Sequence, residues 1–490
     1  MSQHTQDSTH HNPHGRSGRD TIEAPEGQHV SEQATRVLAS RLRGELLFPG
    51  NPDYEAARGV WNGAFDRHPA LIARCAGVED VIAAVHFARE QALPLSVRSG
   101  GHSVAGYGSN EGGMVIDLSR MKALTIIDPE RCTARIEPGL TWSEVSNALQ
   151  AYGLALTAGD TGTVGVGGLL LGGGMGWMVR KYGLAIDRLR AVELVTADGQ
   201  LLRASADEHS ELFWGLRGGG GNFGVATAFE VDLHPGGTIL GGAVFYEASE
   251  AEPILQAYAR LASQAPEELT TQVLLMPAPP APFIPPDKQG TPVVALLLCY
   301  AGDLVEGGRV VAPLRTLGPV IADLVGPMPY PAIFTLAEAA EIRGLQHHVR
   351  SQLFDRPSQE MVHALAEAAR AVMSPATLIQ LRILGGAMSR VSADATAFAH
   401  RDKQAMVMVT HFGPPPSVDA ADLHARTEHV WQALAPYASG AYVNMLGNEG
   451  EQRVHEAYPL ATYARLAALK RQYDPTNLFH LNQNIIPAEV

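Results

Sequence analysis

The sequence is poor in cysteine, in positive charge and in long hydrophobic runs. Its three cysteines, Cys75, Cys132 and Cys299, are odd in number and far apart, so they indicate neither a disulfide framework nor a CxxC metal site, and we expect small core residues. Lys and Arg number 37 against 51 Asp and Glu, for a formal net charge of −14. This balance argues against nucleic acid and anionic membrane surfaces as partners, because both attract basic proteins. No stretch reaches the roughly 18 consecutive apolar residues of a membrane span.

The first thirty residues lack the apolar segment of a secretory signal and are rich in His, Gly and Ser. We expect a disordered tail over residues 1–33, with solvated histidines rather than a metal site. We expect the whole protein to be cytoplasmic and to be a monomer or a small homo-oligomer. The chain also lacks a P-loop lysine, HExxH and GxSxG, the usual signatures of phosphoryl transfer, zinc proteolysis and serine hydrolysis.

Along the remaining chain, the predicted secondary-structure pattern changes twice. Residues 34–236 carry short strands that alternate with helices, including a helix over 78–93 and another over 141–153. From Pro235-Gly236-Gly237 onward, the runs GGAVFY, TTQVLLM, VVALLLCY, TLIQLRIL and AMVMVTHF predict strands of a sheet with helices between them, and a proline-rich connector spans 276–292. A helix over 462–473 precedes a turn at 474–477. These changes predict three parts: 34–236, 237–439 and 440–490.

The chain has 50 glycines, and three clusters of them stand out, at 98–103, 162–176 and 217–225. Consecutive glycines adopt positive φ and let backbone amides converge on an anion such as a diphosphate. Gly219-x-Gly221-x-x-Gly224 matches GxGxxG, but no clean strand precedes it and no acidic residue follows at about 20 positions, so it does not predict a nicotinamide site. His102 follows two glycines, and a neutral imidazole is a nucleophile near pH 7. From the residues alone, a covalent link and an ordinary loop histidine are equally open.

Five segments of the chain carry a resemblance to a known family: VRSGGHSVAGYG, GGMVIDLS, GVGGLLLGGGMGWMVRKYGLAIDRL, ELFWGLRGGGGNFGV and YVNM…YARLAALKRQYDPTNLFHLNQNI. Together they resemble the berberine-bridge-enzyme-like branch of the vanillyl-alcohol-oxidase superfamily. They follow the family order from about residue 45 to the C-terminus, while about 240–430 matches only loosely. The resemblance implies an α+β fold. A PCMH-type FAD-binding domain would be made of the first and last parts. A substrate domain, with an antiparallel sheet backed by helices, would cover the flavin ring.

The resemblance also implies FAD bonded through its 8α position to His102, with residues 98–103 around the diphosphate. The implied cofactor-binding residues are Arg98, Ser99, Gly100, Gly101, His102, Ser103, Gly159, Asp160, Thr161, Val164, Gly165, Gly168, Leu169, Gly173, Gly224, Val225, Asn482 and Asn484. Many relatives attach the flavin a second time through a cysteine, where this chain has Thr161. A single covalent link is therefore predicted. Val164 stands where a small residue is associated with oxidases in the family, which predicts O2 as electron acceptor.

Three residues are predicted to be catalytic. Tyr442 occupies the tyrosine position that several sugar and alcohol oxidases of this branch use as base, although a phenol ordinarily titrates near 10. Asn444 is placed two residues on along the same strand face, where it would orient the ring or the substrate. Gln380 alternates with apolar residues in TLIQLRIL and is predicted to face the flavin.

Three further residues of the second part are open to two interpretations each. Arg382 either binds an anionic substrate group or is a surface charge, and we favour the surface. Thr410 and His411, from VMVTHF, are candidates for the pocket, although a lone histidine on an apolar strand is more often structural.

The function predicted from this resemblance is oxidation of a CH–OH group in a sugar or a secondary-metabolite alcohol, with O2 reduced to H2O2. An alternative is oxidation of a C–N bond, since RSGGH and LIARC are shared with bacterial alkaloid-amine oxidases, which need no tyrosine base. A third is a non-redox role, such as flavin-dependent cyclisation or isomerisation, or a flavin-binding carrier.

Overall fold

The computed structural model describes residues 31–128, 130–338, 343–414 and 420–489. Most of the predicted tail lies outside these ranges. The first helix, α1 (Glu32–Arg41), begins two residues before the predicted start of ordered structure at residue 34, because Ser31 caps it through the amide of Ala34. Among the described residues, no helix has the length and apolar character to cross a membrane.

The first sheet has four strands in the order β1 (Glu45–Leu47), β2 (Leu71–Arg74), β4 (Met114–Asp117), β3 (Leu95–Arg98). Both β2 and β3 run parallel to β4, and the predicted helix over 78–93, α3 (Val78–Glu90), connects β2 to β3. This arrangement places the end of β3, and the glycine loop that follows it, at the carboxyl edge of parallel strands. The short helix α2 (Tyr54–Arg58) packs against β2.

The second sheet is antiparallel, so the expected alternation of strands and helices does not give parallel pairing beyond the first sheet. Its strands are β5 (Leu124–Asp128), β6 (Thr133–Ile136), β10 (Val225–Asp232), β8 (Leu189–Val195) and β9 (Leu201–Ser205), in that order. A short turn through Gly199, at φ +82°, joins β8 to β9 and leaves no room for a crossover helix. Between or beside these strands lie α4 (Trp142–Gln150), the pair β7 (Leu154–Ala155) and β11 (His234–Pro235), α5 (Val166–Gly172), α6 (Val179–Tyr182) and α7 (Ser210–Leu216).

The third large element is an eight-stranded antiparallel sheet. Its strands are β12 (Thr238–Glu247), β13 (Leu269–Pro277), β14 (Pro292–Tyr300), β15 (Val320–Asp323), β16 (Gly326–Pro329), β17 (Gln346–Phe354), β18 (Thr377–Ile383) and β19 (Ala405–Gly413), with the order β15-β12-β14-β13-β18-β19-β17 and β16 beside β12. All five predicted runs are confirmed as strands. The pattern did not predict β15, β16 or β17, and polar residues at most positions of β17 hide its alternation.

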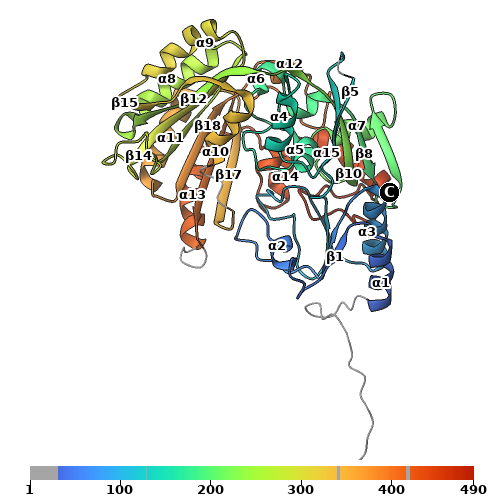
Figure 1. The fold of residues 1–490 in the computed structure, drawn as a ribbon. Coiled ribbons are helices and arrows are strands. Elements are labelled where there is room, and N and C mark those ends of the chain that lie inside the picture. The colour runs from blue at the N-terminus through green and yellow to red at the C-terminus, as the bar shows by residue number, and fades with distance from the viewer. Residues whose placement is uncertain (1–30, 129, 339–342, 415–419, 490) are drawn as a thin grey trace, which may run out of the picture.

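The long helices of this part cover one face of the sheet (Figure 1). Helices α8 (Ala251–Gln264), α11 (Gln359–Val372) and α13 (Ala420–Leu434) lie on it, while α9 (Leu304–Val311), α10 (Thr335–Glu338) and α12 (Ala387–Arg390) are shorter. Strand β14 shows the division: Val294, Leu296 and Leu298 join the core beneath the helices, whereas Ala295 and Leu297 face the opposite way. The uncovered face is therefore turned toward the first two sheets.

The C-terminal segment returns to the first half of the chain, where its red ribbon lies beside α5 and α7 (Figure 1). It contains α14 (Glu451–Ala457) and α15 (Leu460–Tyr473). The buried Lys470 ion-pairs with Asp474 at 2.8 Å and donates to the carbonyls of Asn222 and Phe479. These bonds fix the C-terminal segment against the third glycine cluster.

Candidate active site

A cavity of about 680 Å³ separates the glycine loops from the uncovered face of the eight-stranded sheet. One wall is made by residues 98–104, 159–168 and 220–224, and the other by strands β12, β13, β14, β17, β18 and β19. The volume lies within the usual range of ligand-binding pockets. The cavity therefore joins the two regions that the sequence assigned to cofactor and substrate.

The glycine wall is made largely of backbone. Gly100 and Gly165 touch, and a Cβ on Gly100 would lie 2.4 Å from the amide nitrogen of Gly165, so no larger residue fits at this crossing. Ser99 ties the two loops, since its Oγ donates to the carbonyl of Pro138 and accepts from the amide of Gly167 at 3.2 Å. Arg98 ion-pairs with the buried Asp117 at 2.9 Å beneath the loop.

Two observations on this wall fit FAD. A Cβ at Gly168 or Gly221 would meet no protein atom within 4 Å, although both glycines line the cavity. Arg98 Nη1 and Asn482 Oδ1 are buried without a hydrogen-bond partner among the described residues, and both side chains line the cavity. Such atoms ordinarily bond to a ligand or to water. Open space beside glycine amides, together with these atoms, suits a diphosphate and a hydrogen-bonding ring system.

His102 lies on this wall as a half-buried imidazole beside other rings. Trp61 stacks on it at 5.6 Å between ring centroids, and His347 stacks on Trp61 at 3.9 Å. Burial, with added effects from the charges of Arg343 and His347, lowers the pKa of His102 to about 4. His102 is therefore neutral near pH 7, the form in which a histidine acts as a nucleophile.

The segment of Trp61 and Asn62 links the two walls. The amide of Trp61 donates to Gly101 at 2.9 Å. Asn62 donates to the carbonyls of Val104 and His347 at 3.0 and 2.9 Å, and its Oδ1 accepts from the amide of His347 at 2.9 Å. Neither Trp61 nor His347 was predicted from the sequence, because neither lies in one of the three glycine clusters or in a segment with a clear hydrophobic period.

Asp160 and Thr161 lie where the second glycine cluster meets the sheet. Thr161 and Val164 line the cavity, and the carboxylate of Asp160 ion-pairs with Arg382. The favoured interpretation of Arg382 as a surface charge is wrong: its side chain is only 3% exposed. It is buried because it also donates to the carbonyl of Met175 at 2.9 Å.

The sheet wall is apolar apart from a few polar side chains. Register pairs Gln272 with Arg382 and Leu274 with Gln380, which sets all four on the uncovered face. Thr410 lines the cavity, whereas His411 points to the helix side and bonds Thr427 at 2.9 Å. The apolar residues of this wall include Ala243, Phe245, Leu274, Ala295, Leu297, Val349, Leu378, Met408 and Phe412.

Tyr442 stands where the two walls meet the C-terminal segment. Its hydroxyl oxygen accepts from the amide of Gly174 and from Asn444 Nδ2, both at 2.9 Å. Burial raises the pKa of Tyr442 above its ordinary value, while these bonds, the amide of Met175 and the charge of Arg382 act to lower it. The predicted strand is wrong, since residues Val443–Met445 form a 3₁₀ turn, and this turn brings Asn444 directly onto the phenol.

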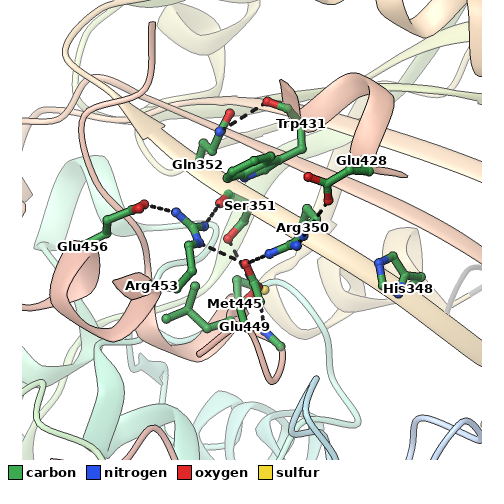
Figure 2. A network of polar contacts seen from close by, with 12 residues as sticks. His348, Arg350, Ser351, Gln352, Glu428, Trp431, Met445, Glu449, Arg453 and Glu456 are labelled. Atoms are coloured by element: carbon green, nitrogen blue, oxygen red, sulfur yellow. Dashed lines mark hydrogen bonds and ion pairs between the residues drawn. The ribbon is translucent and has the colours of Figure 1, made fainter. Parts of the chain in front are cut away.

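A buried ionic network anchors this turn to β17 (Figure 2). Glu449 pairs with Arg350 and with Arg453, at 2.9 Å for the latter, and accepts from the amide of Gly447. The two guanidinium groups lie 5.1 and 5.6 Å from the ring of Trp431. The network thereby holds the segment that follows Tyr442 at a fixed place beside the sheet.

Of the predicted site residues, Gly173, Val225 and Asn484 do not line the cavity, and all the others do. Gly173 serves Tyr442 instead, because a Cβ there would lie 2.9 Å from the phenol ring. Lining residues that were not predicted include Trp61, Tyr107, Phe245, Gln272, Phe283 and His347.

Comparison with known proteins matches two segments of the chain, one on each side of the eight-stranded sheet in sequence, to described families. Residues 69–205 match the family model "FAD binding domain", and residues 441–486 match "Berberine and berberine like". The chain is 32% identical over 458 residues to (R)-6-hydroxynicotine oxidase of Paenarthrobacter nicotinovorans, covering 91% of this chain and 97% of that one. It is 26% identical to a carbohydrate oxidase of Microdochium nivale, covering 94% and 96%.

Among solved structures, 6-hydroxy-D-nicotine oxidase of Arthrobacter nicotinovorans superposes with a TM-score of 0.82 at 30% identity, covering 91% of this chain and 98% of that one. A xylooligosaccharide oxidase of Myceliophthora thermophila in complex with xylobiose gives 0.81 at 25% identity, covering 93% and 100%.

Proposed function

The chain belongs to the berberine-bridge-enzyme-like family of FAD-linked oxidoreductases, and on that premise we propose an oxidase with FAD bonded to His102 alone. Its substrate would be a compact, mostly apolar secondary-metabolite alcohol, oxidised at a CH–OH group. O2 would be the acceptor and H2O2 the by-product.

The observation that carries the alcohol is the setting of the Tyr442 hydroxyl. Burial raises the pKa of Tyr442, and its oxygen faces N–H donors from Gly174 and Asn444 that, with the charge of Arg382, act against this rise. Donors around an oxygen stabilise that oxygen as an anion more than as a neutral phenol. As a phenolate, Tyr442 is therefore suited to take the proton of an alcohol and become a neutral phenol. Burial opposes the phenolate, so the phenol must first lose its own proton to solvent, and activity should rise with pH.

Bound FAD supplies the two-electron oxidation of the substrate carbon. The protein's part is to hold that carbon against the ring, keep water out and accept the hydroxyl proton at Oη of Tyr442 in its phenolate form. Asn444 keeps the phenol in place, since its Nδ2 bonds both Tyr442 and the carbonyl of Leu169.

The apolar sheet wall supports a compact apolar substrate over an oligosaccharide. A sugar presents hydroxyl groups on all sides and needs a partner for each, because an unpaired buried polar group costs about 1–3 kcal/mol. The wall instead offers mainly side chains such as Phe245, Leu297 and Met408.

The single link to His102 is supported by its neutral state and by Thr161, which lines the cavity with no thiol to offer. The choice of O2 rests on Val164, a small residue at the cavity wall. The covalent link is tested on purified protein, and the electron acceptor is tested by the O2 uptake described below. After acid precipitation, we expect a yellow pellet and an intact mass greater than the chain by one FAD. The same treatment of His102→Ala should leave a colourless pellet, and a yellow wild-type supernatant would refute the covalent bond.

Oxidation of a C–N bond is the second candidate, because the relative at 32% identity is a 6-hydroxynicotine oxidase. Tyr442→Phe separates the two. An alcohol needs the base, so kcat should fall by roughly 10²–10⁴-fold. An amine already carries a lone pair, so its loss should stay below about tenfold. Tyr246→Phe is the matched control, since its buried hydroxyl donates to the carbonyl of Leu314 in the core beneath the helices and does not line the cavity. An oxygen electrode reads every variant, and turnover without O2 uptake would contradict the oxidase.

A further inference from the structure

Gln272 and Gln380 form a hydrogen-bonded pair on the sheet wall. Gln380 Nε2 donates to Gln272 Oε1 at 2.7 Å, and Arg382 Nη2 donates to the same oxygen at 2.5 Å. All three side chains are at least 95% buried. Strand register explains the grouping, because Gln272 on β13 pairs with Arg382 on β18, and Gln380 lies two residues away on the same face.

The arginine decides which way both amides point. A guanidinium has donors and no acceptor, so the Gln272 atom that it meets must be the oxygen. The Gln380 atom on that oxygen must then be its NH2 group. Among the described residues, no protein group bonds Gln272 Nε2 or Gln380 Oε1, and both side chains line the cavity. The pair therefore presents one donor and one acceptor of fixed identity to the cavity.

The charge of Arg382 does not extend to a ligand. Its guanidinium is used by Asp160, Met175 and Gln272, and the Asp160 carboxylate balances it. The neighbouring wall residues Leu274, Leu297 and Leu378 are apolar. A ligand at this place meets neutral polar groups in an apolar setting, where a net charge would be costly.

We infer that Gln272 and Gln380 form a recognition subsite for a neutral group that both accepts and donates a hydrogen bond, such as an amide, a lactam or a hydroxyl, on an otherwise apolar substrate. Gln272 donates to its oxygen, and Gln380 accepts its N–H or O–H. The subsite excludes carboxylates, since a carboxylate has no hydrogen for Gln380 Oε1. This inference rests on the proposed function, because it takes the cavity to hold the substrate.

Three probes of similar shape test the subsite by isothermal titration calorimetry on the FAD-loaded protein. Benzamide accepts and donates, acetophenone only accepts, and benzoate is anionic. One hydrogen bond corresponds to about a fivefold change in Kd. We expect benzamide to bind about fivefold more tightly than acetophenone, and benzoate to bind at least about tenfold more weakly than benzamide.

Two variants separate the roles of the pair. Gln380→Met should weaken benzamide about fivefold, to the level of acetophenone, and leave acetophenone unchanged. Gln272→Met should weaken both by about fivefold. Thr410→Val, which removes a hydroxyl from the same wall, is the control and should keep the wild-type ratio. Melting temperature and FAD content confirm that each variant is folded and loaded.

Several outcomes overturn the subsite. One is equal binding of benzamide and acetophenone by the wild type, and another is that neither binds. Tighter binding of benzoate than benzamide, lost in Arg382→Met, would show instead that Arg382 receives an anionic substrate. These results concern loaded protein, so they leave the flavin assignment standing. Absence of FAD from the purified protein would refute the proposed function itself.

Discussion

The two walls of the cavity are built by different means. The glycine wall is backbone, and at the crossing of Gly100 and Gly165 there is no room for a Cβ. The sheet wall is made of side chains that strand register brings together, such as Gln272 and Gln380. A backbone wall fixes one ligand and tolerates little change, whereas a side-chain wall can change substrate without disturbing the fold. The first therefore suits a constant cofactor and the second a variable substrate.

The largest expected effect comes from adding one methyl group to the glycine wall. In Gly165→Ala the new Cβ would lie 2.2 Å from the amide nitrogen of Gly100, so the loops must separate. We expect a loss of stability of about 1–3 kcal/mol, typical of overpacking, and FAD content below about a tenth of wild type. Absorbance at the flavin band and chemical denaturation measure both.

Gly168→Ala sharpens this test, because its Cβ meets no protein atom. We expect unchanged stability of the apoprotein but reduced FAD content. The sheet-wall variant Met408→Leu should keep full FAD. Full FAD content in Gly168→Ala would show that the ligand does not approach this part of the wall.

The second effect concerns the ionic network behind the sheet wall. Glu449→Gln removes the charge that the half-buried Arg350 and the buried Arg453 share (Figure 2). Arg350 keeps Glu428 and Arg453 keeps Glu456, so the cost should stay below about 3–5 kcal/mol, the cost of a buried charge left unpaired. The melting temperature should fall accordingly, and KM should rise as the turn after Tyr442 loosens. Glu367→Gln breaks the exposed pair with Arg370 and should cost less than about 1 kcal/mol. Equal costs in the two variants would mean that the network does not stabilise the wall.

The same difference explains what the sequence could predict. The glycine wall is contiguous in sequence, so the clusters at 98–103, 162–176 and 217–225 marked it directly, and the residues carried over for FAD nearly all line the cavity. The five strand runs were also evident, since each is rich in apolar residues over six residues or more.

The sheet wall was harder to predict because it depends on pairing. Nothing near Arg382 in sequence indicates Asp160, which lies 222 residues away, and an arginine without a visible partner was assigned to the surface. Strand β17 was missed because its inward residues include His347 and Ser351, so the hydrophobic alternation fails where the strand lines the site. Asn444 was correctly linked to Tyr442, but through a turn rather than a strand.

A smaller effect is expected from Arg382→Met on the pH dependence. The charge of Arg382 lowers the pKa of Tyr442, so removing it should raise that pKa further. If Tyr442 is the base, the limb of kcat/KM that rises with pH should move to higher pH. Arg390→Met, which breaks an exposed pair with Glu267, should not move it. An unmoved limb in Arg382→Met would mean that the limb reports another group.

The smallest effect is expected on the glycine wall, in the pH dependence of covalent flavin attachment at His102. The pKa of His102 is about 4, so the imidazole stays neutral from pH 7.5 down to pH 5.5. Mixing apoprotein with FAD should therefore give rates of covalent attachment that agree within about twofold at the two pH values, whereas a histidine of ordinary pKa, about 6.5, would be roughly tenfold slower at pH 5.5. Acid-stable flavin measured against time decides between them.

Arg343→Met removes one of the charges that lower the pKa of His102, so any slowing of attachment at low pH should grow in that variant. Because burial is the largest cause of the lowered His102 pKa, the change caused by Arg343→Met should be small. A tenfold slowing of attachment at pH 5.5 already in the wild type would show that the rings around Trp61 do not shield His102 from protonation.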